Sequence, residues 1–266
     1  MNATSLLRRA GPLTLLVWAY RSLSALLCLW PISEQLAAAP ASFKSTAPNG
    51  HAASGFLLQV AINHGSRLLL WSGACALLYA ALSPLLTLAW LHAMVGGEAP
   101  IPCIRKAVAD YRSGFALLAV AALAYVTLAA ATALAFVYGV RLTETILAED
   151  GLRIACGAVA LSCALMIATA HDLSQAALVR HKRGILLSLH HAILQLSPRI
   201  LAMHALLTLA IAAISFGADG IGRVDSSWLG STASFALQQT LVLGTVGLRG
   251  FWLALTLQRI ATRRES

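Results

Sequence analysis

Charged residues are scarce in this chain: Asp, Glu, Lys and Arg make up 11% of its 266 residues, whereas soluble domains carry about 25%. Acidic residues are the scarcest, with 10 Asp and Glu against 19 Lys and Arg, so the formal net charge is +9. Hydrophobic residues make up 59%, and the mean hydropathy is +0.77. This balance excludes an ordinary soluble domain and indicates that lipid is the solvent for most of the chain.

Short catalytic and metal-binding motifs are also missing. The sequence contains no HExxH, no GxSxG and no phosphate-binding glycine loop, and its five cysteines include no CxxC pair. The histidines do not occur at the spacings that zinc or haem ligation would require. We therefore expect no enzyme activity, no cofactor and no metal site.

Long apolar runs dominate what is present. A helix needs about 20 mainly apolar residues to cross a bilayer, and lipid excludes open sheet edges because their backbone groups would stay unsatisfied. The chain is thus predicted to be all-α, an integral membrane bundle that forms a single transmembrane domain over residues 1–266. Six transmembrane helices are expected, at about 12–32, 68–95, 115–140, 154–170, 200–216 and 232–257.

The basic residues are distributed unevenly between the two sides of this predicted bundle. Lys and Arg near short loops mark the cytoplasmic side, and one side collects 12 of the 19: Arg8, Arg9, Arg105, Lys106, Arg112, Arg180, Lys182, Arg183, Arg199, Arg259, Arg263 and Arg264. Both termini are therefore predicted to be cytoplasmic. The positive charge then reports topology rather than nucleic-acid binding. Abundant Arg, Ala and Leu favour a bacterial source and hence the inner membrane.

A basic, amphipathic segment separates the fourth and fifth predicted spans. From His171 to His204 the chain reads HDLSQAALVRHKRGILLSLHHAILQLSPRILAMH. Its polar residues Ser188, His191 and Gln195 recur at helical spacing, which predicts a cytoplasmic amphipathic elbow helix within 180–197. The residues expected to contact the anionic inner leaflet or a partner are Arg180, Lys182, Arg183, His191 and Arg199.

Three interpretations of this elbow stay open. A connector that sets the tilt of two spans is the plainest. A docking surface for a cytoplasmic or membrane partner and a sensor of specific lipids are the alternatives, and a row of cationic residues alone does not separate them.

The leading charged residues inside or at the edge of predicted spans are Arg21, Asp172 and Arg249. Asp172 and Arg249 both fall near the cytoplasmic boundary when positions are counted inward along their helices. Because an unpaired charge is costly there, we predict a structural ion pair between them. A proton or ion pathway would normally require more buried acidic residues.

The last predicted span carries residues suited to helix–helix packing. Gln238 and Gln239 can form hydrogen bonds with neighbouring helices. Gly244, Gly247 and Gly250 recur every third residue and would permit close approach of another helix. We expect these residues to lie at helix interfaces.

The run from His171 through SPRILAMHALLTL, together with the later ALQQTLVLGTVGLRGFWLALTLQ, resembles a group of uncharacterised six-span bacterial membrane proteins. More distantly, it is similar to the membrane domain found with glycerophosphodiester phosphodiesterases and to YciC-like proteins. In that group the fourth span typically ends in an acidic residue, here Asp172. A phosphodiesterase catalytic domain is absent from this sequence, so the resemblance implies a membrane fold without that activity.

These features favour a non-enzymatic integral membrane subunit or scaffold of a membrane protein assembly. The expected partners are membrane lipids, especially those of the anionic inner leaflet, and other membrane or cytoplasmic proteins, with no nucleic acid. The alternative is a transporter or permease component for a lipid or small amphiphile. Broken helices, paired acidic residues or an inverted repeat would favour transport, and the sequence offers little of these.

Overall fold

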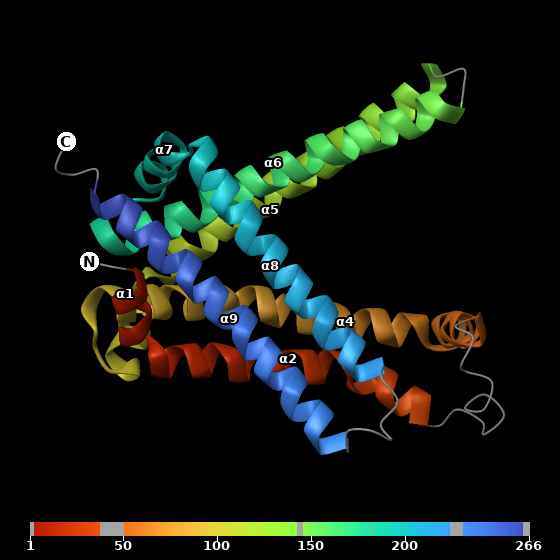
Figure 1. The fold of residues 1–266 in the computed structure, drawn as a ribbon, viewed down its shortest axis with the longest axis horizontal. Helices are drawn as coiled ribbons and strands as arrows, with labels where there is room; N and C mark the ends of the chain where they lie inside the picture. Colours follow the sequence, from red (N-terminus) through yellow and green to blue (C-terminus); the bar gives the residue numbers. More distant parts are fainter. Residues whose placement is uncertain (1–2, 38–50, 143–145, 183, 224–230, 263–266) are drawn as a thin grey trace. The chain divides into compact units, whose positions relative to one another are not determined.

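The computed structural model describes residues 3–37, 51–142, 146–182, 184–223 and 231–262, and Figure 1 shows its helices. The described residues are almost entirely α-helical and include no strand, which confirms the all-α prediction. The helices are α1 (Ala3–Arg9), α2 (Gly11–Ala37), α4 (His51–Gly96), α5 (Pro100–Leu142), α6 (Ile146–His181), α7 (Ile185–Gln195), α8 (Pro198–Arg223) and α9 (Ser231–Thr262).

Several of these helices are suited to crossing a membrane. Within the described residues, five are long and apolar enough: Gly73–Gly96, Pro100–Val140, Glu149–His181, Pro198–Gly217 and Ala236–Ala261. They contain or overlap the last five predicted spans, so the protein is a multi-pass membrane protein. The remaining predicted span, 12–32, falls in α2, where some side chains lie outside the described residues. A total of six spans stays a prediction.

The chain divides into two compact units. Unit 1 comprises Met1–Leu15 and Pro84–Ser266, and unit 2 comprises Leu16–Ser83. A single transmembrane domain over residues 1–266 stays a prediction.

Unit 2 consists of parts of α2 and α4 joined by aromatic contacts. The rings of Tyr20 and Tyr79 stack with their centroids 5.5 Å apart, and the Tyr20 hydroxyl donates a hydrogen bond to the backbone carbonyl of Tyr79. Trp71 donates from its indole N–H to the backbone carbonyl of Leu27 at 2.8 Å. The phenol of Tyr20 and the indole of Trp71 thus each use their polar group in a hydrogen bond between α2 and α4.

Helix α6 organises unit 1, because it packs against α5, α7, α8 and α9. It forms a long hairpin with α5, while α8 and α9 lie side by side and run in opposite directions (Figure 1). Large apolar side chains that are almost fully buried form the core of the unit: Trp90, Leu91 and Met94 of α4, Leu117 of α5, Leu173 of α6, and Val246 and Leu253 of α9.

Two helices of unit 1 end in a residue with left-handed backbone. Gly97 follows α4 with φ of 65° and donates from its N–H to the Ala93 carbonyl, a common helix end that needs no Cβ. Lys182 takes the equivalent place after α6 with φ of 48°, donating to the Leu178 carbonyl. A non-glycine residue is strained in this region. The turn at Lys182 leads through Gly184 into α7.

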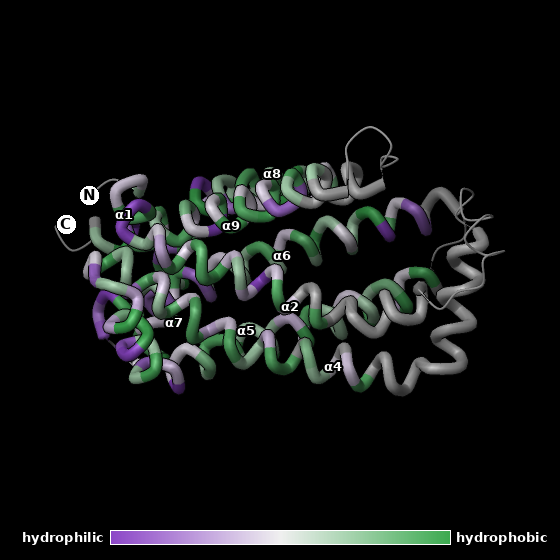
Figure 2. Tube along the Cα trace, turned by 90° about the horizontal axis from the view of Figure 1, so that it is seen from below, coloured by the Kyte–Doolittle hydropathy of each residue, from purple (hydrophilic) through white to green (hydrophobic). Residues whose placement is uncertain are grey.

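Polar and apolar residues are separated along unit 1. Figure 2 shows hydrophilic residues gathered near α1 and α7, while α5 and α6 are apolar along much of their length. The polar end of unit 1 therefore contains α7 and the residues around it.

Candidate functional site

The most densely bonded ionisable group in unit 1 is the carboxylate of Asp172 on α6. Its side chain is buried, and Arg249 of α9 donates one hydrogen bond to each of its oxygens at 2.5 Å. This two-pronged geometry is the strongest form of Arg–carboxylate contact. The structure thus brings together the two residues for which the sequence predicted an ion pair.

A third donor to the same carboxylate comes from the next turn of α9. The indole N–H of Trp252 donates to Oδ2 of Asp172 at 2.7 Å. The Trp252 ring also stacks on the imidazole of His204, with centroids 4.2 Å apart. His204 belongs to α8, so the cluster joins α6, α8 and α9.

The hydrogen bonds around His204 indicate which of its two ring nitrogens carries the proton. The Thr169 hydroxyl donates to the backbone carbonyl of Leu165 at 2.7 Å, and its oxygen lies 2.7 Å from Nδ1 of His204. Because the hydroxyl proton is already used, the oxygen accepts from Nδ1–H. The other ring nitrogen, Nε2, lies 4.0 Å from Asp172.

This arrangement suits a structural clamp, in which Asp172 of α6 is held by Arg249 and Trp252 of α9, better than a reaction centre. Three donors occupy the two oxygens of Asp172, which leaves little capacity to exchange a proton with a substrate. Removing one partner of such a buried pair costs about 3–5 kcal/mol because a charge is left uncompensated. Among the described residues, no group of three or more His, Cys, Asp or Glu side chains is placed to hold a metal ion.

A smaller polar pair joins α4 to α5 in the same unit. His92, which is largely buried, lies 2.9 Å from Oδ2 of the half-buried Asp110. Lys106 pairs with Glu98 at the exposed turn nearby. This side of the bundle is therefore held by contacts that solvent can reach, in contrast with Asp172.

Helix α7 turns Ser188 and Gln195 toward the bundle and most of its large apolar side chains outward. Ser188, Ala192 and Gln195 are buried, and α7 packs against α6 and α5. Its large apolar side chains Leu186, Leu187, Ile193 and Leu194 are exposed, Leu186 by 81%. Such an outward apolar face is what an interfacial helix presents to acyl chains. The position of α7 at a membrane surface remains a proposal.

The predicted leaflet-contact residues are distributed around α7. Arg180, Lys182 and Arg199 are exposed, while His191 is half-buried and its ring meets that of His181 edge to face at 5.4 Å. Arg183 lies outside the described residues.

Of the three glycines that the sequence pattern singled out in α9, only Gly250 lies at a close helix approach within the described residues. A Cβ at Gly244 or Gly247 would meet no other described atom within 4 Å, whereas one at Gly250 would lie 2.5 Å from the Trp90 ring. The reason is rotational, because α9 presents Gly250 to α4 and leaves the other two glycines facing open space. Gln238 and Gln239 are half-buried on the same helix.

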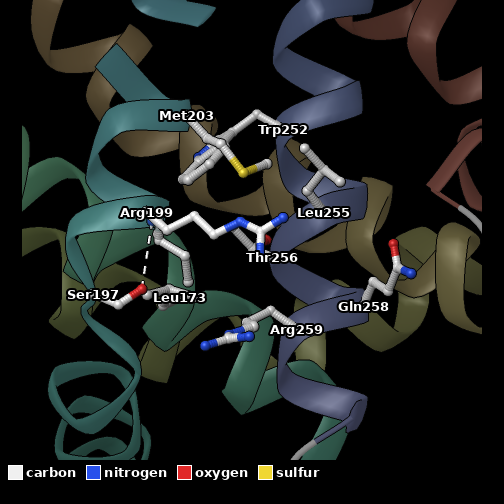
Figure 3. Close-up of a pocket in the computed structure, with 10 residues that line it drawn as sticks. Leu173, Ser197, Arg199, Met203, Trp252, Leu255, Thr256, Gln258 and Arg259 are labelled. Carbon is white, nitrogen blue, oxygen red and sulfur yellow. Dashed lines mark hydrogen bonds between the residues drawn. The ribbon is translucent and has the colours of Figure 1, made fainter. Parts of the chain in front are cut away.

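A pocket opens between α8 and α9 beside the Asp172 cluster (Figure 3). Its volume is about 320 Å³. The residues that line it are Leu173, Ser197, Arg199, Ile200, Met203, Trp252, Leu255, Thr256, Gln258 and Arg259. In the close-up, both arginine side chains extend into the space between the two helices.

The sequence interpretation missed several members of these sites. Trp252 lies one turn beyond Arg249, and this spacing could have indicated a second contact of α9 with Asp172. The contact of Thr169 with His204 and the position of Arg199 and Arg259 in one pocket depend on how the helices are rotated about their axes. The sequence pattern does not determine this rotation.

Comparison with protein-family models, curated proteins and solved structures finds no match to this chain. The resemblance to six-span bacterial membrane proteins therefore stays a prediction, and the function is argued from the site alone.

Proposed function

We propose that the protein is a non-enzymatic integral membrane subunit or scaffold of a membrane assembly, located in a bacterial inner membrane with both termini cytoplasmic. The observation that carries this proposal is the bonding of Asp172. Its oxygens are used to tie α9 to α6 rather than being left open to a substrate.

The exposed surface of the α5–α6 hairpin also supports the proposal. Leu123, Val126 and Leu134 of α5 and Val159 and Leu161 of α6 are all more than half exposed. In a membrane, such surfaces contact lipid or another transmembrane helix, and helix association there depends on packing rather than on the hydrophobic effect. A scaffold requires surface of this kind.

The test is photo-crosslinking in the native membrane. A photoreactive residue placed singly at Val126, Leu161 or Leu186 reports what touches α5, α6 or α7. A scaffold is expected to give protein adducts, identified by mass spectrometry, at one of these positions and lipid adducts at the others. Serine at the crosslinked position should release the partner, and serine at a position with lipid adducts serves as the matched control.

A transporter component for a lipid or small amphiphile is the second candidate, favoured by the pocket between α8 and α9. Proteoliposomes containing the purified chain and a fluorescent phospholipid distinguish the two functions. Lipid adducts at all three positions, together with lipid movement that depends on the protein, would replace the scaffold proposal with transport.

A further inference from the structure

The pocket between α8 and α9 combines two cations with an apolar wall. Arg199 from α8 and Arg259 from α9 line it (Figure 3). The remaining lining is mostly apolar, with the polar side chains of Ser197, Thr256 and Gln258 among it. Such a lining suits a ligand that has an anionic end and a hydrocarbon end.

The positions of the arginines along their helices place them at the same end of the bundle. Arg199 is the second residue of the candidate span Pro198–Gly217, and Arg259 is the third from the end of Ala236–Ala261. Because α8 and α9 pack side by side in opposite directions, the start of one meets the end of the other. The ends of membrane spans lie at the level of the lipid headgroups.

The apolar wall continues from the arginines toward the middle of the spans. Met203 lies one helical turn after Arg199, while Leu255 and Trp252 lie one and two turns before Arg259. Residues at these spacings share a helix face. The pocket therefore runs from a cationic opening to an apolar interior, in the direction in which an acyl chain enters a bilayer.

The charges near the pocket favour an anion. The nearby carboxylate of Asp172 is neutralised by Arg249 and covered by Trp252, whose indole N–H it binds. In the part of the chain that the structure describes, Arg199 forms no ion pair. Guanidinium groups bind phosphate oxygens through two parallel hydrogen bonds, and basic pockets between membrane helices are suited to anionic headgroups.

We propose that this pocket binds one anionic phospholipid, with its phosphate held by Arg199 and Arg259 and one acyl chain lying along Met203, Leu255 and Trp252. The shared chemistry is a phosphate anion, which a free phosphate ion could also supply. The apolar wall assigns the site to a lipid. The inference does not rest on the scaffold function, because a subunit and a transporter could each hold such a lipid.

The test is native mass spectrometry of the full-length protein purified in mild detergent and titrated with phosphatidylglycerol. Phosphatidylcholine with the same chains and inorganic phosphate form the comparison arms. We expect one phosphatidylglycerol to bind with an affinity at least about 10-fold higher than that of phosphatidylcholine, since charge-assisted hydrogen bonds distinguish the headgroups. Inorganic phosphate alone should bind weakly and should not displace the lipid.

Two substitutions separate the parts of the site. The double variant R199Q/R259Q should lower the affinity for phosphatidylglycerol by about 10- to 100-fold. Met203→Trp should block the acyl chain while leaving both arginines in place. The matched control is Arg105→Gln, which removes an exposed basic residue of α5 that does not line the pocket and should leave the affinity unchanged.

Three results would overturn the proposal. Equal binding of the two lipids would remove the anion preference, and equal losses of affinity in R105Q and the double variant would show general attraction to positive charge. Displacement of phosphatidylglycerol by equimolar inorganic phosphate, with Met203→Trp having no effect, would show that the site binds the ion alone. A monodisperse elution profile for each variant shows that it has folded.

Discussion

The two halves of α6 have opposite environments. In the first half, Ile154, Val159 and Leu161 are exposed, Leu161 by 73%. In the second half, Thr169, Asp172, Ser174 and Gln175 are almost completely buried. A soluble helix would be arranged the other way, because burying polar groups costs free energy and exposing apolar ones forgoes the hydrophobic effect.

This difference indicates that the first half of α6 is suited to contact with lipid and the second half to contact with other helices. The apolar half of α6 needs lipid or an apolar partner to cover it, whereas its polar half is covered by other helices of unit 1, to which Asp172 and Thr169 form hydrogen bonds. Helix α7 repeats the arrangement, with buried Ser188 and exposed Leu186. The polar groups carry the specific contacts of the fold, and the apolar groups carry its affinity for the membrane.

Loss of the Asp172 carboxylate should lower the stability of the protein more than any other substitution in the polar half of α6. Asp172→Ala leaves Arg249 and the Trp252 N–H without their acceptor, so we expect the free energy of unfolding in detergent to fall by about 3–5 kcal/mol. Thermal unfolding of the purified protein measures the loss. Asp110→Ala is the matched control, because its pairing with His92 is partly exposed, and it should cost about 1 kcal/mol.

The double variant D172A/R249A tests whether the two residues act as a pair. Removing both charges should be milder than removing Asp172 alone, since no buried charge is left uncompensated. A double variant at least as unstable as each single variant would contradict the clamp.

A new charge on the apolar half should act on membrane insertion. Leu161→Lys replaces an exposed leucine near the middle of the candidate span Glu149–His181 and should disfavour insertion by roughly 3 kcal/mol. A glycosylation-reporter assay measures the inserted fraction. Gly151→Lys adds the same charge near the end of the span, where a Cβ has open space, and should have a small effect. Equal insertion of both variants would show that this half of α6 does not lie in lipid.

Substitution of Gly250 tests the packing of α9 on the buried side. In Gly250→Val the new atoms meet the Trp90 ring and Leu7, and overpacking of this kind costs typically 1–3 kcal/mol. Gly244→Val and Gly247→Val should leave the thermal stability of the purified protein nearly unchanged. If instead they weaken a complex isolated from membranes, these two glycines contact a partner as the sequence suggested.

The smallest expected effect is a gain at the turn between α6 and α7. Lys182→Gly relieves a left-handed backbone conformation and should stabilise the protein by about 1 kcal/mol. The unfolding midpoint measures the gain, with Arg180→Gly as the control that removes a basic residue from the helix itself. A loss of stability in K182G would mean that the Lys182 side chain makes a contact worth more than the strain.

Sequence reasoning located five of the spans, because membrane spans are encoded by composition over about 20 residues. It also paired Asp172 with Arg249, since both positions could be counted from the same ends of their helices. It could not find the contact of Asp172 with Trp252 or the face of α7 that turns outward, because these depend on helix rotation. Gly244 and Gly250 lie on one helix and differ only in direction, a distinction that a small-residue pattern does not contain.

The clamp between α6 and α9 also has a consequence for the order of synthesis. Asp172 leaves the ribosome 77 residues before Arg249, a delay of about 4–15 s at bacterial and eukaryotic elongation rates of roughly 5–20 residues per second. During that interval the carboxylate of Asp172 has none of its α9 donors. Helix α9 therefore supplies the last donors to Asp172, and a chain that stops before Arg249 keeps this carboxylate without any of them.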